Sequence, residues 1–229
     1  MAAAFVTVAQ SATTAPLNPA YKEEEFAFYL EDLKARAIIL EAGYQGPARS
    51  AAQRFDMSVI ELHPASKAGQ FTLTTQSTGA IEDCEPQADD IALILHTSGT
   101  TSRPKIVPLL QSNIAASAQN IQKSLALTPD DCCLNVMPLF HIHGLIAAVT
   151  ASLAAGASIS CASGFDALKF YGWLEDVNPS WYTAVPTMHQ AILARAPRNL
   201  DIIKNARLRF LRSSSSSLPG PVMTELAET

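Results

Sequence analysis

The chain has 229 residues, 48% of them hydrophobic, which is enough for one large domain or two small ones with a substantial core. Its formal net charge of −5 and the scattering of its 16 Lys and Arg residues exclude a nucleic-acid-binding surface, because phosphate contacts need clustered positive charge. No apolar run approaches the ~20 residues of a membrane-spanning helix.

The first part of the chain is predicted to form one helix followed by short strands. Pro19 and the acidic residues Glu23 to Glu25 predict a helix that begins near Asn18 and ends at about Arg36. Apolar runs then predict strands at 37–40, 57–62, 71–74 and 91–95. An acidic, turn-rich segment separates the last two of these strands.

Strands and helices alternate more regularly in the rest of the chain. The apolar pattern predicts strands at 106–110, 131–139, 157–162, 180–185 and 208–213. It predicts helices at 111–125, 145–155, 166–177 and 187–196, and a last one from 219. Ser112 or Asn113 is expected to cap the first of these helices. The alternation is typical of crossover connections, so we expect an α/β fold with a largely parallel sheet flanked by helices.

The cysteines and the start of the chain bear on the compartment. None of the four cysteines forms a C-x-x-C pair, so we expect reduced thiols and no metal site. No Lys or Arg precedes Lys22, which makes the first residues a poor signal or transit peptide. We therefore expect a cytoplasmic protein, or a peroxisomal one for a full-length form.

Three unusual sequences directly follow predicted strands, at the sheet edge where open parallel sheets bind ligands. They are HTSGTTSRPK (96–105), PLFHIHG (138–144) and SSSSSLPG (213–220). In the first, Gly99 permits a sharp turn, Lys105 adds a positive charge, and hydroxyls and turning amides form an anion cradle. These features favour polyphosphate binding, with a plain polar turn as the alternative. The spacing of a Walker loop is absent.

The segment Thr97-Ser98-Gly99-Thr100-Thr101, followed by Pro104-Lys105, resembles the phosphate-loop signature of the AMP-forming acyl-CoA synthetases, within the adenylate-forming, AMP-binding family. Further stretches resemble family motifs in the family's order: APLNPAY (15–21), PLFHIHGL (138–145), WYTAVPTM (181–188) and LRFLRSSSSSLP (208–219). Order and spacing together identify the chain as a member. Ser102, in place of a glycine, and the two histidines of FHIHG resemble the branch that ligates oxalate to CoA. Ile106 also replaces a glycine, at a cost only if its φ is positive.

The resemblance implies that a small carboxylate, best represented by oxalate, is activated by ATP to an acyl-adenylate and then to a CoA thioester. The implied cofactors are ATP, Mg²⁺ and coenzyme A. His141 and Lys105 take the catalytic roles, and His141 also lines the acid pocket with His143 and Ser214. The ATP-binding residues implied by the resemblance are Thr97, Ser98, Gly99, Thr100, Thr101, Ser102, Lys105, Ser215 and Ser216.

These assignments have structural alternatives. His141 also fits a hydrogen-bonded histidine at a strand end, and His143 a packing role. The serines also fit a Ser-rich turn. Arg212, directly before the serines, is either a carboxylate clamp or a partner in a structural ion pair, and we expect the ion pair. A hydrolase with a serine nucleophile is disfavoured, because no G-x-S-x-G sequence is present.

Against the family pattern, residues 1–229 resemble an incomplete N-terminal AMP-binding domain, truncated at both ends. The glutamate motif that places Mg²⁺, the ribose-binding aspartate and the C-terminal domain with the adenylating lysine have no counterpart in the sequence. We therefore expect weak or no catalysis from this chain alone. The alternative function is an inactive fragment, a nucleotide- or partner-binding remnant of such a ligase.

Overall fold

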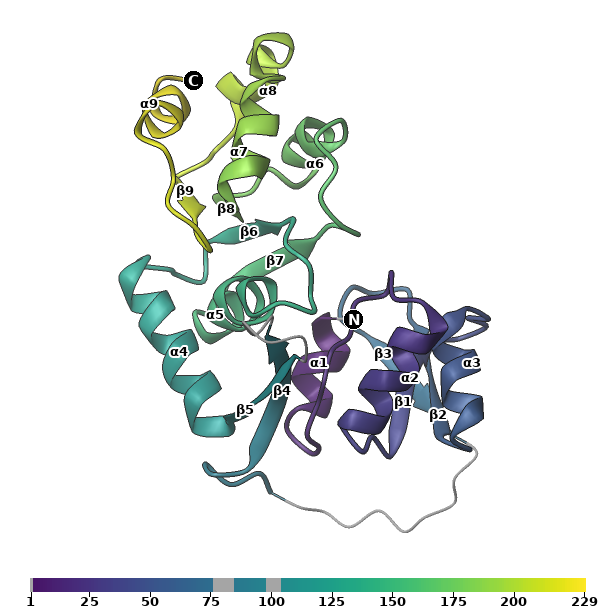
Figure 1. Cartoon of the computed structure of the whole chain (residues 1–229). Helices are drawn as coiled ribbons and strands as arrows, with labels where there is room; N and C mark the ends of the chain where they lie inside the picture. The colour runs from purple at the N-terminus through teal and green to yellow at the C-terminus, as the bar shows by residue number, and fades with distance from the viewer. Residues whose placement is uncertain (1, 76–84, 98–103) are drawn as a thin grey trace. The chain divides into compact units, whose positions relative to one another are not determined.

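A computed structural model describes residues 2–75, 85–97 and 104–229 of the chain (Figure 1). Helices and strands alternate in these residues, which confirms the α/β class. They divide into two compact units, Met1–Leu109 and Leu110–Thr229, and each unit contains its own hydrophobic cluster.

Unit 1 contains two small sheets and the helices beside them. Its elements are α1 (Ala2–Val8), α2 (Glu23–Asp32), α3 (Pro47–Arg54), β1 (Ala37–Glu41), β2 (Ser58–Pro64), β3 (Phe71–Thr74), β4 (Ile91–Thr97) and β5 (Lys105–Leu110). Strand β1 runs parallel to β2, whereas β3 runs antiparallel to β2. Strands β4 and β5 form a second sheet. All the strands predicted for this part are present, and the antiparallel pair is a departure from a purely parallel arrangement.

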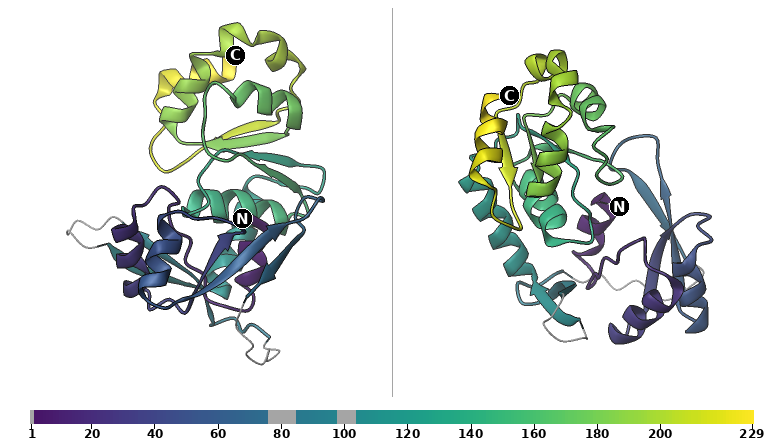
Figure 2. Two further views of the ribbon diagram at one scale, coloured as in Figure 1. Left: turned by 90° about the vertical axis from the view of Figure 1, so that its right-hand side faces the viewer. Right: turned by 45° about the horizontal axis from the view of Figure 1, so that its top comes forward.

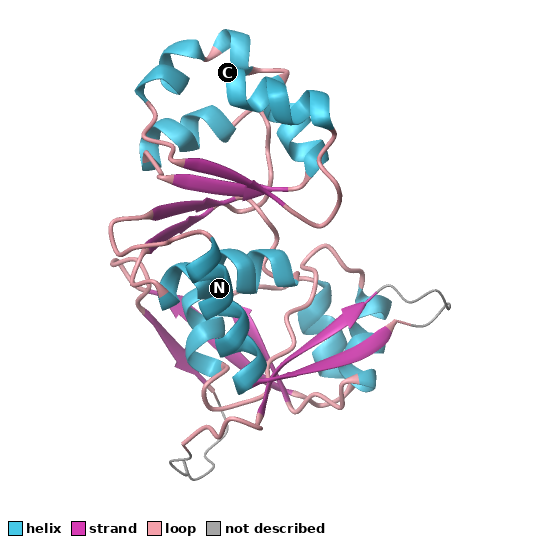
Figure 3. Ribbon diagram, turned by 90° about the vertical axis from the view of Figure 1, so that its left-hand side faces the viewer, coloured by secondary structure: helices cyan, strands magenta, loops and turns pink. Residues whose placement is uncertain are grey.

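Helices α2 and α3 pack against the three-stranded sheet of unit 1 (Figure 3). Their buried side chains include Phe26 and Leu30 of α2, which lie in one cluster with Ile38 of β1. The predicted start of α2 near Asn18 is wrong. The Lys22 backbone N–H donates to the Glu25 carboxylate at 2.9 Å, so the helix is capped and begins only after Lys22. It ends at Asp32, well before the predicted Arg36.

Unit 2 is built on a four-stranded parallel sheet in the order β7-β6-β8-β9. Its strands are β6 (Cys132–Asn135), β7 (Ser158–Cys161), β8 (Trp181–Ala184) and β9 (Phe210–Ser213). Its helices are α4 (Gln111–Ser124), the π-helix η1 (His143–Thr150), α5 (Ala151–Ala154), α6 (Phe170–Val177), α7 (Pro186–Leu193), the 3₁₀ helix η2 (Ala196–Arg198), α8 (Leu200–Asn205) and α9 (Gly220–Glu228). The predicted parallel sheet with crossover helices is confirmed.

Helices cover both faces of this sheet (Figure 2). Successive side chains of a strand point to opposite faces. Cys133 and Trp181 therefore pack toward α4, η1 and α5, and Leu134 and Tyr182 pack toward α6 and α7. Two hydrophobic layers result, and the sheet lies between them.

Two local details of unit 2 differ from the predictions. Strand β6 ends at Asn135 rather than at 139, because the Asn135 side chain turns back to the Met137 backbone, accepting its N–H at 3.1 Å and donating to its carbonyl at 3.2 Å. Helix α4 has Leu110 as its N-cap, and Asn113 acts from within the first turn by accepting the Leu110 N–H at 3.0 Å. Ser112 is not the cap.

Candidate functional site

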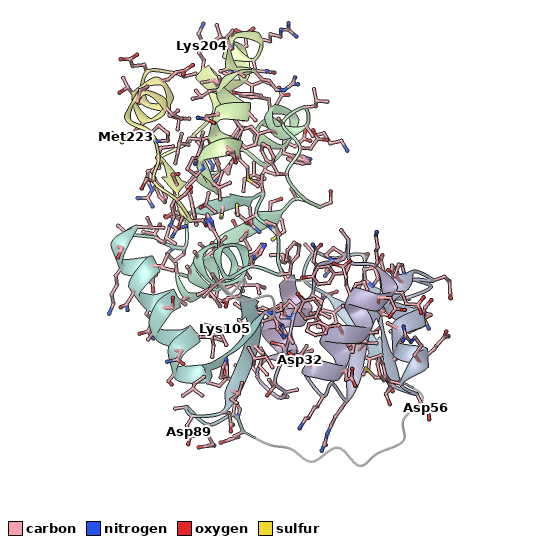
Figure 4. All side chains as sticks on the ribbon, viewed as in Figure 1. Asp32, Asp56, Asp89, Lys105, Lys204 and Met223 are labelled. Carbon is pink, nitrogen blue, oxygen red and sulfur yellow. The ribbon has the colours of Figure 1, made fainter. Side chains whose placement is uncertain are left out.

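The predicted phosphate loop begins and ends on the two-stranded sheet of unit 1. Thr97 is the last residue of β4, and Lys105, labelled in Figure 4, is the first residue of β5. Both are exposed. Ser98, Gly99, Thr100, Thr101 and Ser102 lie outside the described residues, so their roles stay predictions. Ile106 lies within β5 and is not among the described residues with positive φ, so replacing glycine there costs little strain.

His96 is a residue of this segment that the sequence analysis did not select. Its imidazole is 8% exposed, and its Nε2 lies 3.3 Å from Oδ2 of Asp32 at the end of α2. The ring also packs edge-on against Tyr29, with 4.7 Å between the ring centroids. His96 therefore anchors the strand that leads into the loop to the neighbouring helix. The sequence signal that could have identified His96 is its position as the first residue of HTSGTTSRPK.

In unit 2, four polar residues form one row across the sheet at the carboxyl ends of its strands. The strand register aligns Cys161 of β7 with Asn135 of β6, Asn135 with Thr183 of β8, and Thr183 with Arg212 of β9. Residues aligned across parallel strands share a face of the sheet. The Asn135 amide contacts the Cys161 sulfur at 3.8 Å, and Arg212 Nη1 donates to Thr183 Oγ1 at 3.3 Å. The row lies at the edge where open α/β sheets bind ligands.

His143 joins this row from the π-helix η1. Its Nε2 lies 2.6 Å from Thr183 Oγ1 and 3.0 Å from Arg212 Nη1, and its Nδ1 lies 3.1 Å from Ser215 Oγ. A guanidinium group only donates hydrogen bonds, so Nε2 must be an acceptor. The ring proton is therefore on Nδ1, which donates to Ser215. We call these four residues, His143, Thr183, Arg212 and Ser215, the histidine–arginine cluster.

The imidazole of this cluster is neutral. Burial lowers the pKa of His143 from 6.5 to about 4, and the electrostatic interactions with Arg212 and with His189 act in the same direction. His189 supports the cluster from the other face of the sheet: it donates from Nε2 to the Arg212 carbonyl at 3.3 Å and accepts from the Tyr182 hydroxyl at 3.2 Å. Arg212 is thus held at both its side chain and its backbone.

The chain approaches itself closely to bring His143 into place. Gly144 follows it, and a Cβ on Gly144 would collide with the Pro138 carbonyl and lie 3.0 Å from the Met137 oxygen. Only glycine fits this approach without a backbone shift. His143 is the first residue of the π-helix, an element found frequently at functional sites. His143 is 5% exposed, whereas Ser215 is exposed and is the member of the cluster at the surface.

The other predicted site residues of unit 2 lie outside the cluster. His141 is exposed, and its ring contacts that of Phe140 with 4.6 Å between centroids. Ser214 is half-buried and donates its backbone N–H to the Ala184 carbonyl at 3.3 Å. Ser216 is exposed. Of the two histidines in FHIHG, it is therefore His143 that the structure places among polar partners, and the roles of the other three residues stay predictions.

The prediction that Arg212 forms a structural ion pair is wrong for the part of the chain that the structure describes. Its side-chain partners there, His143 and Thr183, carry no negative charge. The ion pair is made instead by Arg209, whose Nη2 lies 2.8 Å from Oδ2 of the buried Asp131. Asp131 also accepts from the Ser180 hydroxyl at 2.6 Å. This pair holds the amino ends of the strands, opposite to the cluster.

Other features of the described residues offer no competing site. The described cysteines Cys132, Cys133 and Cys161 are free thiols. Within residues 2–75, 85–97 and 104–229, no three His, Cys, Asp or Glu side chains are grouped to hold a metal ion. No helix in those ranges is long and apolar enough to cross a membrane. Two shallow hollows of unit 1 lie beside α2, and neither is lined by a predicted site residue.

Together, these features define an α/β protein whose parallel sheet has a polar carboxyl edge. The model of the AMP-binding enzyme family matches residues 1–229, and the chain belongs to this family. This confirms the membership that the order of the motifs predicted.

Among curated proteins, the chain is 40% identical to an oxalate–CoA ligase of Arabidopsis thaliana over 95% of its own length and 43% of that protein. It is 35% identical to an oxalate–CoA ligase of Saccharomyces cerevisiae over 89% of its length and 41% of that protein. The chain thus spans less than half of these relatives.

Solved structures share the fold. A malonyl-CoA ligase in a ternary product complex with methylmalonyl-CoA and AMP superposes with a TM-score of 0.80 at 24% identity, over 98% of this chain and 46% of that one. ATP-bound MatB from Rhodopseudomonas palustris gives 0.78 at 25% identity, over 99% of this chain and 45% of that one. The first of these likenesses concerns the fold alone.

Proposed function

We propose that the chain is part of an AMP-forming acid–thiol ligase, in which it binds ATP and a small carboxylic acid. The acid, with oxalate as the leading candidate, is converted to an acyl-adenylate and then to a CoA thioester. Family membership supports the reaction class, and the oxalate–CoA ligases at 40% and 35% identity support the acid. The observation that carries the proposal is the histidine–arginine cluster, a cationic and hydroxyl-bearing group at the ligand-binding edge of the sheet.

The chemistry of the cluster favours a small anion over a long acyl chain. Arg212 supplies positive charge, Ser215 and Thr183 supply hydroxyls, and the neutral His143 holds them together. A long hydrocarbon chain would require an apolar lining instead. The cluster therefore supports a short, polar acid as the substrate.

The proposed reaction is limited by repulsion between the carboxylate and the phosphates of ATP. Catalysis is then chiefly positioning and charge stabilisation. Lys105 and the hydroxyls of residues 97–102 are proposed to hold the β- and γ-phosphates while pyrophosphate leaves. His141 is proposed to line the acid pocket. Mg²⁺ is proposed to enter with the phosphates of ATP, as is usual for this ion.

The test is an acid panel with a purified chimera in which residues 1–229 replace the matching part of the Arabidopsis relative. Pyrophosphate release from ATP and thioester formation with CoA are measured with oxalate, malonate, acetate and a long-chain fatty acid. Oxalate is expected to give the highest kcat/KM. Thioester formation with the fatty acid but not with oxalate would refute the substrate, and no acid-dependent pyrophosphate release would refute the reaction.

A second candidate function is a nucleotide- and acid-binding part of such a ligase that has little activity by itself. The share of the relatives' length that the chain covers favours it. At 43% of the Arabidopsis relative, the 229 residues by themselves are expected to bind ATP and the acid with little or no turnover. A side-by-side assay of the 229-residue chain and of a chimera, in which residues 1–229 replace the matching part of the relative, separates the two. Robust turnover by the 229-residue chain alone would contradict the second candidate.

A further inference from the structure

We infer that Arg212 is a specificity-determining residue whose guanidinium binds the second, non-reacting carboxylate of a short dicarboxylic acid, with His143 as its positioning residue. The inference rests on the proposed function, because it concerns the acid taken by the same site. From the sequence, His143 was one of several predicted pocket residues. For Arg212, a carboxylate clamp and a structural ion pair were the two alternatives, and the ion pair was expected.

The first argument is charge balance. Arg212 is half-buried, and its side-chain partners among the described residues, His143 and Thr183, are both neutral. A guanidinium removed from water without a counter-ion is unfavourable, so a bound anion adds the missing charge. Arg209, three residues earlier, has the buried Asp131 as its counter-ion and therefore has no such demand.

The second argument is the supply of hydrogen-bond donors. A guanidinium has five N–H groups, and the bonds of Arg212 to its described partners use Nη1 alone. Nε and Nη2 remain for a bidentate contact with a carboxylate, the geometry that Arg favours. Ser215 accepts from His143 Nδ1, so its own hydroxyl proton is available to a ligand. Ser215 is exposed, which leaves this side of the cluster open to an incoming acid.

The third argument is that His143 holds the arginine without neutralising it. A carboxylate in its place would pair with Arg212 and repel an acid substrate. The neutral imidazole instead accepts from Nη1 at 3.0 Å and leaves the positive charge uncompensated. Its other nitrogen donates to Ser215 at 3.1 Å, so one ring sets the positions of both ligand donors. His143 acts through these groups and does not touch the acid.

The test measures binding to the 229-residue chain by calorimetry, with oxalate and with glyoxylate. Glyoxylate has the same two carbons and lacks one carboxylate. The wild type is expected to bind oxalate about 10- to 100-fold more tightly than glyoxylate, the effect of one charge-assisted contact. Arg212→Met should abolish this preference by weakening oxalate alone, and the matched control Arg207→Met, on an exposed arginine near the start of the same strand, should leave it unchanged.

Three further variants keep the test decisive. Arg212→Gln preserves a donor toward His143 and removes the charge, so it replaces the Met variant if that one fails to fold. His143→Gln, with one acceptor and one donor, should retain most of the oxalate preference, whereas His143→Leu should lose it although Arg212 is intact. A merely structural His143 would make the two His143 variants differ in stability but not in the oxalate-to-glyoxylate ratio.

Three results would overturn the inference: equal wild-type affinities for the two acids, no wild-type binding of either, or unchanged oxalate affinity in both Arg212 variants. Each is distinguishable from failure of the proposed function, which is judged by thioester formation in the acid panel. Protein that makes thioesters from acids without any dependence on Arg212 would keep the proposed function and remove Arg212 from substrate selection.

Discussion

His143→Gln should remove a large part of the pH dependence of the stability of unit 2. His143 is neutral and buried in the folded chain, and its pKa is lowered from 6.5 to about 4, mainly by burial. The unfolded chain therefore binds a proton on His143 at a pH where the folded chain does not. By proton linkage, the contribution of His143 to stability is complete above pH 6.5 and is lost as the pH falls toward 4.

The magnitude follows from this pKa difference. A fall from 6.5 to about 4, at about 1.4 kcal/mol for each pH unit, sets an upper bound of about 3 kcal/mol. Between about pH 7.5 and about pH 5, roughly 2 kcal/mol of it should be lost, because the folded imidazole is still neutral at the lower value. The acidic groups that titrate near pH 4 contribute little within this window.

Denaturant unfolding followed by tryptophan fluorescence is the suitable assay. Both tryptophans, Trp173 and Trp181, lie in unit 2, so the signal reports on the unit that contains His143. The free energy of unfolding is measured at the two pH values for the wild type, for His143→Gln and for His141→Gln. The last variant is the matched control, because His141 is an exposed histidine of the same motif.

The wild type and the His141 variant should both lose about 2 kcal/mol more than His143→Gln on acidification. His189, whose pKa is also lowered by burial, contributes equally to all three proteins and cancels in the comparison. The same loss in His143→Gln as in the wild type would refute a neutral, buried His143. An imidazole nitrogen spectrum that shows His143 protonated at pH 6 would refute it independently.

Asp131→Asn should cost about 2 kcal/mol of unfolding free energy, because Asp131 is 4% exposed and its carboxylate accepts several hydrogen bonds. The control is Asp130→Asn, at an exposed aspartate. Equal denaturation midpoints for the two variants would contradict the reasoning. Gly144→Ala should cost about 1 to 3 kcal/mol, measured in the same way, since its Cβ would force a backbone shift. Lys105→Ala should weaken ATP binding about 10-fold by calorimetry, whereas Lys123→Ala should not; equal losses would remove Lys105 from the phosphate site.

The order of helices and strands was predictable from local sequence patterns, but the residues at which some of them begin and end were not. Apolar runs such as 91–95 and 208–213 place the strands correctly, because strand propensity and burial act on the same few residues. Helix α2 was placed too early at its start, since Pro19 is a strong start signal and the competing cap is the side chain of Glu25. Both signals are present in the sequence, and the structure has the cap made by Glu25.

The candidate site was predictable in composition and unpredictable in arrangement. Each motif supplied part of it: the histidines of FHIHG, the threonine of WYTAV and the serines after β9. The alignment of Thr183 with Arg212 depends on strand register, which no single strand encodes. The choice of His143 over His141 depends on the π-helix, whose register cannot be derived from the continuous apolar run Leu145 to Val149.

Two arginines near opposite ends of strand β9 have different partners, one a carboxylate and the other neutral groups. Arg209 lies at the amino end of β9, where Asp131 gives it a counter-ion and Ser180 completes the carboxylate's hydrogen bonds. A charge paired in this way does not require a further counter-ion. Arg212 lies at the carboxyl end of the strand, where its partners in the described chain are neutral, so its charge can be compensated from outside. Because ligands of open parallel sheets bind at the carboxyl ends of the strands, Arg212 lies at the end of the strand where the proposed acid would bind.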